Sequence, residues 1–91
     1  MNKAIQDIAA ERERQISVEG WTPEHDDAYR HDELAKAAAC YAFGSPRGWP
    51  WLMKWWKPDT KRRNLVKAAA LIVAEIERID RAAHPKEQSN G

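Results

Sequence analysis

The sequence has little cysteine, few glycines and no long apolar run. Its 91 residues contain one cysteine, Cys40, so no intrachain disulfide framework supports the fold. The longest unbroken apolar run, residues 68–74, is far shorter than the ~20 residues that span a bilayer. The N-terminus also lacks the apolar core of a secretory signal peptide. We therefore expect a protein of the cytoplasm that has no membrane partner.

Strand patterns, internal repeats and a glycine-rich phosphate loop are also missing. The length fits one domain, and a chain of this size buries only about 60–65% of the surface that its unfolded form exposes. The net charge of +1 argues against general nucleic-acid binding. These features predict a small all-α domain over residues 1–83, followed by a polar, disordered tail over residues 84–91.

Helix signals divide the chain into three main helices. Apolar spacing and Gly20 predict a helix from about Lys3 to Glu19. Thr22, as an N-cap followed by a proline, predicts a short helical turn. A second helix, over residues 34–43, is rich in alanine and is expected to use Asp32 as its N-cap. Pro46, Gly48 and Pro50 then predict an irregular connector with one helical turn within residues 51–56.

The third main helix is predicted from Asp59 or Thr60 to Ala83, and its apolar residues follow a heptad pattern. They are spaced 4, 3, 4, 3 and 4 residues apart: Leu65, Ala69, Ile72, Ile76, Ile79 and Ala83. This apolar face is wider than one short neighbouring helix requires. We therefore expect a helical hairpin plus this long helix to form a homo-oligomer through the long helix and the alanine-rich face.

Charge is distributed unevenly along the chain. Residues 19–33 hold six carboxylates and one arginine, whereas residues 47–67 hold seven cations and one aspartate. Three consecutive cations, Lys61, Arg62 and Arg63, oppose the dipole at the start of the last helix, so a bound phosphate would offset their cost. Pairing with the acidic segment 24–33 is the structural alternative.

The strongest compositional signal is aromatic. Four of the five tryptophans (Trp49, Trp51, Trp55 and Trp56) lie within eight consecutive residues, next to the basic stretch that begins at Lys57. Indole rings beside cations suit a nucleotide, but they equally suit the core of a small protein, and at least two should pack against the alanine-rich helix. We predict a ligand site formed by Trp55, Trp56, Lys57, Lys61, Arg62, Arg63 and Arg47.

Other chemistry has weaker support. Glu24, Asp27 and His31 have helical spacing that suits one divalent cation, yet N-capping and loop fixation explain them equally well. Cys40 lies among alanines without a nearby histidine in the sequence, as a packed thiol would. We predict no catalytic residue, no resident metal and no cofactor.

Several segments in order resemble a family of small proteins encoded by tailed phages and prophages. The segments are residues 11–15 (ERERQ), 19–27 (EGWTPEHDD), 33–42 (ELAKAAACYA), 49–51 (WPW), 55–58 (WWKP), 64–68 (NLVKA) and 75–78 (EIER). The resemblance covers about residues 11–81. It implies a viral origin and an accessory role, and it supplies no catalytic residues.

A second resemblance is to the all-α nucleotide pyrophosphohydrolases of the MazG type, through the Glu-Arg-x-Arg-Gln helix, the Gly-Trp step and the acidic His-Asp step. Their magnesium site resembles a Glu-Glu-x-x-Glu helix paired with a Glu-x-x-Asp helix. Here residues 33–38 read ELAKAA, and the late helix offers Glu75, Glu77 and Asp80 in another register. The resemblance thus implies a nucleotide-shaped scaffold whose metal-binding pattern is broken.

Together these features favour a non-enzymatic phage accessory protein in the host cytoplasm that sequesters a nucleotide-derived defence signal. The first alternative is an inhibitor that binds a host protein through exposed indoles, with Trp49 and Trp51 as anchors. The second is a small magnesium-dependent nucleotide hydrolase that uses Glu24, Asp27 and Glu33.

Overall fold

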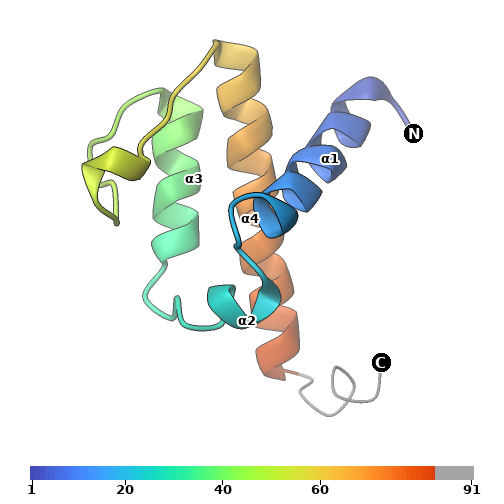
Figure 1. Cartoon of the computed structure of the whole chain (residues 1–91), viewed down its shortest axis with the longest axis vertical. Helices are drawn as coiled ribbons and strands as arrows, with labels where there is room; N and C mark the ends of the chain where they lie inside the picture. Colours follow the sequence, from blue (N-terminus) through green and yellow to red (C-terminus); the bar gives the residue numbers. More distant parts are fainter. Residues whose placement is uncertain (84–91) are drawn as a thin grey trace.

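The computed structural model describes residues 1–83, and the chain folds into helices joined by loops (Figure 1). The elements are α1 (Lys3–Ser17), α2 (Pro23–Asp26), α3 (Glu33–Phe43), the 3-10 turn η1 (Met53–Trp55) and α4 (Lys61–Ala83). Residues 1–83 contain no strand, which confirms the all-α prediction. The predicted tail, residues 84–91, lies outside the described residues. Among the residues described, no helix is both long enough and apolar enough to cross a membrane.

Side-chain caps explain where most helices begin. Asn2 Oδ1 accepts from the Ile5 amide at 2.9 Å, Thr22 Oγ1 accepts from the His25 amide at 3.2 Å, and Thr60 Oγ1 accepts from the Arg63 amide at 3.2 Å. Thr22 was predicted as a cap, and the structure confirms it. Each bond satisfies an amide that has no partner within its own helix.

Asp32 does not cap α3, so this prediction is wrong. Its backbone is left-handed, with φ of 66°, and its side chain makes no capping bond. An N-cap side chain reaches the first free amides from an extended backbone, which Asp32 does not have. Glu33 Oε1 instead accepts from the His31 amide at 2.7 Å, and this bond fixes the loop before the helix.

Helices α3 and α4 run antiparallel and pack along each other (Figure 1). Leu34 and Tyr41 of α3 and Leu71 of α4 form the centre of an apolar cluster. The other buried members are alanines: Ala37, Ala38, Ala68 and Ala74. Small side chains on both helices let the two backbones approach closely, as the alanine-rich sequence predicted.

The packing of α1 against α4 has a different chemistry. The buried residues of α1 are Glu11, Arg12 and Gln15, whereas Ile5 is exposed. The predicted helix is present, but its aliphatic spacing did not identify the buried face. Arg12 explains the difference, because its guanidinium bonds to Asp26 Oδ2 at 3.0 Å and to Glu77 Oε1 at 3.0 Å.

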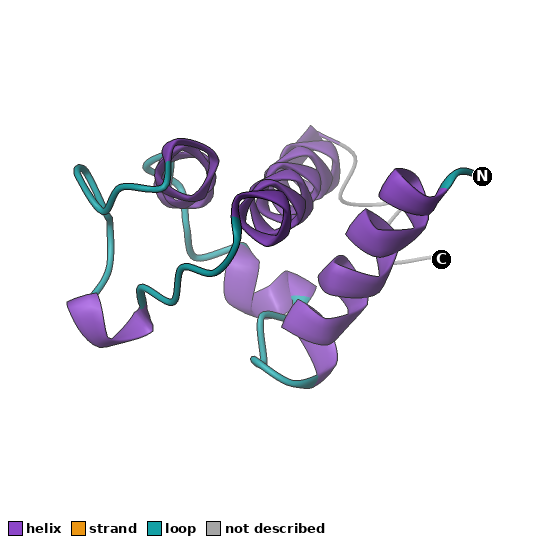
Figure 2. Cartoon of the chain, turned by 90° about the horizontal axis from the view of Figure 1, so that it is seen from above, coloured by secondary structure: helices purple, strands orange, loops and turns teal. Residues whose placement is uncertain are grey.

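The chain forms two layers. Seen from above, α1, α2 and the connector with η1 lie on one side of the α3–α4 pair (Figure 2). The connector covers α3 on that side, where the Cys40 thiol donates to the Arg47 carbonyl at 3.4 Å. The tryptophans packed on the core cluster belong to this layer.

Candidate functional site

The connector between α3 and α4 has a fixed backbone. Gly48 has φ of 86°, a left-handed conformation that glycine adopts without strain. The Trp49 amide donates to the Pro46 carbonyl at 2.8 Å, and Trp49 Nε1 donates to the Leu52 carbonyl at 3.1 Å. These bonds hold the segment that leads into η1, so the indoles attached to it are positioned before any ligand arrives.

Three of the clustered indoles pack on the core. Trp49 and Trp56 flank the Tyr41 ring with centroid distances of 5.6 and 4.7 Å, and Trp49 also contacts Trp51 edge to face at 5.2 Å. Trp56 was predicted as a ligand residue, but the structure places it in this aromatic packing. Trp55 differs, because 43% of its surface remains exposed.

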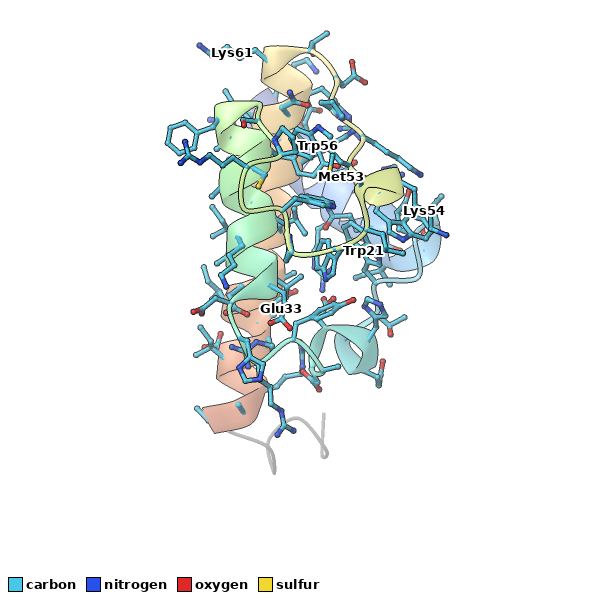
Figure 3. All side chains as sticks on the ribbon, turned by 90° about the vertical axis from the view of Figure 1, so that its left-hand side faces the viewer. Trp21, Glu33, Met53, Lys54, Trp56 and Lys61 are labelled. Carbon is cyan, nitrogen blue, oxygen red and sulfur yellow. The ribbon has the colours of Figure 1, made fainter. Side chains whose placement is uncertain are left out.

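Trp51 links the connector to the segment before α3. Its ring lies 5.8 Å from that of Trp21 and 5.2 Å from that of Tyr29. Beside these rings is a cavity of about 690 Å³, which we call the aromatic pocket; it is lined by Glu19, Trp21, His25, Tyr29, Pro50, Trp51, Leu52 and Trp55. Figure 3 shows Trp21 beneath the connector, with Lys54 at the outer edge of η1.

Two lysines flank the exposed indole of the pocket. Lys54 Nζ lies 5.2 Å and Lys57 Nζ 5.4 Å from the centroid of the Trp55 ring, both within cation–π range. Lys57 was predicted from the sequence beside Trp55, and the structure brings the two together. Lys54 was not in the predicted site, although its place next to Trp55 in the sequence was an available signal.

Polar side chains at one end of the pocket form a connected series. Tyr29 Oη lies 3.3 Å from His25 Nε2, and His25 Nδ1 lies 3.6 Å from the buried Asp26 Oδ1. Burial raises the pKa of Tyr29, and the charges of Asp26 and Glu33 raise it further. The phenol therefore stays protonated near neutral pH, where it can donate a hydrogen bond but is a poor nucleophile.

Glu19 supplies the carboxylate of the pocket. Its Oε1 accepts from Arg14 Nη1 at 2.9 Å, and Arg14 also binds Glu11 through Nε at 2.8 Å. These carboxylates raise the pKa of Arg14, so its charge is permanent. Of the pocket residues, Glu19, Trp21, His25 and Tyr29 were not predicted. Their proximity to Trp51 depends on how distant segments fold together, which local patterns do not report.

The predicted basic cluster at the start of α4 is divided by ion pairs. Arg62 Nη2 lies 2.9 Å from Asp7 Oδ2, and Arg63 pairs with the buried Glu11. The structural alternative predicted partners within residues 24–33; the partners are instead on α1. Charge reversal at Arg62 and Arg63 would therefore disturb the contact between α1 and α4 in addition to any phosphate site.

Lys61 and Arg47 lie apart from the aromatic pocket. Lys61 is the exposed first residue of α4, beside a shallow depression that is also lined by Phe43 and Asn64. Arg47 is exposed on the connector, where its amide donates to Ser45 Oγ at 3.3 Å. Of the seven predicted ligand residues, only Trp55 lines the pocket, and Lys57 adjoins it through Trp55.

The structure does not bring the candidate metal residues together. Asp27 Oδ1 accepts from Arg81 Nη2 at 2.7 Å, while Glu24 and His31 are exposed. Within residues 1–83, no group of three histidine, cysteine or acidic side chains is arranged to hold a metal ion. Burial also raises the pKa of the Cys40 thiol, which keeps it protonated.

Comparisons of the chain with family models, with curated proteins and with solved structures give no match.

Proposed function

We propose that this protein is a non-enzymatic binding protein whose aromatic pocket sequesters a nucleotide-type small molecule. The observation that supports it is a cavity of about 690 Å³ lined by three indoles and a phenol, with two lysine ammonium groups beside Trp55. The volume falls within the roughly 300–1,000 Å³ typical of small-molecule sites. Flat rings suit a base, and the lysines suit its phosphates.

Each part of such a ligand has a matching group. A base would stack on Trp55, with Trp21 and Trp51 forming the walls, and Glu19 would accept a hydrogen bond from an amino group on the base. Lys54 and Lys57 lie beside Trp55, where phosphates would meet cations.

Binding is favoured over turnover by the state of the reactive groups. Burial holds both Tyr29 and Cys40 in their protonated forms, and Asp27 is held by Arg81. The resemblance to phage accessory proteins supplies the biological part of the proposal: the ligand would be a nucleotide-derived signal of host defence.

Isothermal titration calorimetry against nucleotides and cyclic dinucleotides tests the proposal. Trp55→Ala should weaken binding about 5- to 150-fold, which corresponds to the ~1–3 kcal/mol of one stacked base. Lys54→Glu and Lys57→Glu should also weaken binding, and high salt should reduce the affinity of the unmodified protein. Lys36→Glu, which changes an exposed lysine on α3, is the matched charge control.

Circular dichroism should show unchanged helix content in each variant. The proposal is overturned if no nucleotide binds, or if Trp55→Ala binds with unchanged affinity. If a nucleotide binds, mass spectrometry can identify the natural ligand among the small molecules that the protein retains from a nucleotide-rich extract. A sequestered nucleotide should be released chemically unchanged when the protein is denatured.

A protein partner is the second candidate function, and a different observation favours it. Leu52 and Met53 are exposed next to Trp55, so the outer surface of the connector offers three adjacent large apolar side chains. Trp49 and Trp51, the anchors predicted from the sequence, are half-buried in aromatic packing. Loss of a captured host protein on Met53→Ser, with nucleotide binding unchanged, would support this function.

A further inference from the structure

The side of the α3–α4 pair that faces away from the connector has an uncovered apolar surface. On α4 it contains Leu65, Ile72, Ile76 and Ile79, each between 45% and 52% exposed. On α3 it contains the exposed residues Ala35, Ala39 and Ala42. We call these seven residues the back face. The elements of the other layer lie on the opposite side of the pair (Figure 2).

Helix geometry shows why neither α3 nor α1 covers this face. At about 100° per residue, the exposed aliphatic residues of α4 fall within an arc of about 60°. Ala68 and Leu71 lie on the side of α4 that packs on α3. Arg63 and Glu77 lie on the side that bonds to α1. The aliphatic arc is therefore a third side of α4, which neither neighbour covers.

The spacing on this third side is that of a helix-pairing seam. Leu65, Ile72 and Ile79 are seven residues apart, and Ala69 and Ile76 lie between them at heptad positions. A seam with this period keeps facing a second helix along its whole length. The alanines of α3 beside it leave room for large side chains of a partner. Residues 84–91 (HPKEQSNG) hold no large aliphatic side chain with which to cover it.

We propose that the back face binds a second copy of this chain, with the two α4 helices antiparallel across a twofold axis near Ile72. In this register Leu65 meets Ile79 of the other copy, and Ile72 meets itself. Homodimers most often have such twofold symmetry, in which one surface patch complements itself. The inference does not depend on the proposed ligand.

Charge order along α4 selects the antiparallel arrangement. Arg62 precedes the seam and Asp80 follows it, and both lie on the same edge of the seam by helix geometry. Arg62 pairs with Asp7 of its own chain, but its side chain is 58% exposed and can also meet a carboxylate of another copy. An antiparallel pair places each Arg62 beside Asp80 of the other copy, at both ends of the interface. It also places Lys61 near the C-terminal end of the other α4, where a cation is favourable. A parallel pair would instead bring the basic starts of both helices together.

The first test is the mass of the full-length protein in solution, measured by light scattering after size exclusion. The unmodified protein should be a dimer at about 100 μM, and dilution should dissociate it. Ile72→Glu should raise the dissociation constant about 100-fold or more, because each copy then buries an unpaired carboxylate at the axis. Phe43→Glu, at an exposed apolar residue outside the back face, should leave the dimer intact.

A monomer at every concentration overturns the proposal, as does a dimer that Ile72→Glu leaves unchanged. Circular dichroism of Ile72→Glu checks that the chain stays folded. If it does not, Ile72→Cys gives a second route, because cysteines at the axis should form an intermolecular disulfide on mild oxidation, while the buried Cys40 should not.

Charge exchange tests the orientation. Arg62→Asp and Asp80→Arg are made in an Asp7→Asn background, which removes the charge that Arg62 pairs with on α1. Each should weaken the dimer, because each places like charges together at both ends. The double variant should restore most of the affinity, since the pairs form again with reversed sign. If neither single variant weakens the dimer, or if the double variant is weaker than both, the antiparallel register is wrong.

Discussion

Helix α4 packs against both α3 and α1, and the chemistries of these two contacts are opposite. Toward α3 it presents Ala68, Leu71 and Ala74, which are buried against other apolar side chains. Toward α1 it presents Arg63 and Glu77, which bind charged partners. One helix therefore depends on close packing along one side and on paired charges along another.

The comparison shows how a short chain supplies enough buried contacts. The contact between α3 and α4 involves no charge pairing. Its stability depends on how well the side chains fill the space between the helices, so deleting side-chain atoms creates a cavity. The polar contact buries Glu11 and Asp26, whose carboxylates must be paired because an isolated buried charge is costly. The polar contact should therefore respond to pH and to loss of one partner, and the apolar contact to loss of volume alone.

Arg12→Met should give the largest effect, because it removes the cation that joins Asp26 and Glu77. Breaking a buried pair typically costs about 3–5 kcal/mol, so we expect a loss of that size in the free energy of unfolding near pH 7. Urea denaturation measures it. Burial raises the pKa of Asp26, partly opposed by Arg12, so the loss should shrink in acid as the unpaired carboxylate takes up a proton.

The matched control for this variant adds Asp26→Asn to Arg12→Met. The double variant should lose less stability than Arg12→Met alone, since no unpaired charge remains buried. If the two variants are equally destabilised at pH 7, the contact between α1 and α4 does not depend on charge pairing.

Leu71→Ala should have the next largest effect and tests the apolar contact. Leu71 is fully buried, so truncation should lower the free energy of unfolding by about 2–5 kcal/mol. Leu65→Ala on the same helix should cost less than half as much, because Leu65 is 45% exposed. Both are best measured by urea denaturation in the Ile72→Glu background, where association adds nothing. Equal losses would contradict the assignment of the buried face of α4.

Local sequence signals predicted the helices well but not which faces they bury. Thr22 with Pro23, and Gly44 before Pro46, mark helix ends through backbone geometry, which neighbouring residues determine. The buried face of α1 consists of Glu11, Arg12 and Gln15, and no count of aliphatic residues would select them. Their burial depends on partners far along the chain, such as Glu77.

The candidate site was predictable only in part, for the same reason. Trp55 and Lys57 are neighbours in the sequence, so their cation–π contact followed from composition. Trp21 and Tyr29 join Trp51 because the segment after α1 folds against the connector, which no local pattern encodes. The heptad residues of α4 were recognisable as a seam, and the structure adds that α3 and α1 both leave that seam uncovered.

Acid should weaken the polar contact through Glu11. Burial raises the pKa of this carboxyl, but hydrogen bonds and charges from Arg14 and Arg63 outweigh burial and hold the pKa below its ordinary value of 4.5. A lowered carboxyl pKa adds stability above the unfolded pKa, and this stability is lost as the pH falls through the folded value. The free energy of unfolding should therefore drop below about pH 4.5.

Glu11→Gln is the variant that isolates this response. It should be less stable than the unmodified protein at pH 7, by about 1–3 kcal/mol, because Arg14 and Arg63 lose a charged acceptor. It should also lose less further stability in acid, since the glutamine does not titrate. Asp26 has the opposite effect on stability in acid, because its raised pKa means that the folded protein favours the neutral carboxyl. Urea midpoints between pH 3 and pH 7 measure the stability of both proteins. If the midpoints of Glu11→Gln and of the unmodified protein fall in parallel as the pH is lowered, Glu11 is not the acid-sensitive group.

Asp7→Asn should have the smallest effect, although Asp7 makes two ion pairs. It binds Lys3 at 2.9 Å and Arg62 at 2.9 Å, and these partners hold its pKa below the ordinary value. Both partners are exposed, so water and salt screen the charges and the paired state gains little over the solvated one. Thermal unfolding at low and high salt, measured in dilute protein, should give nearly the same midpoint for Asp7→Asn and the unmodified protein. A clear loss would mean that the pair at the start of α4 is part of the buried polar contact, and that this contact extends further along α1 than Glu11.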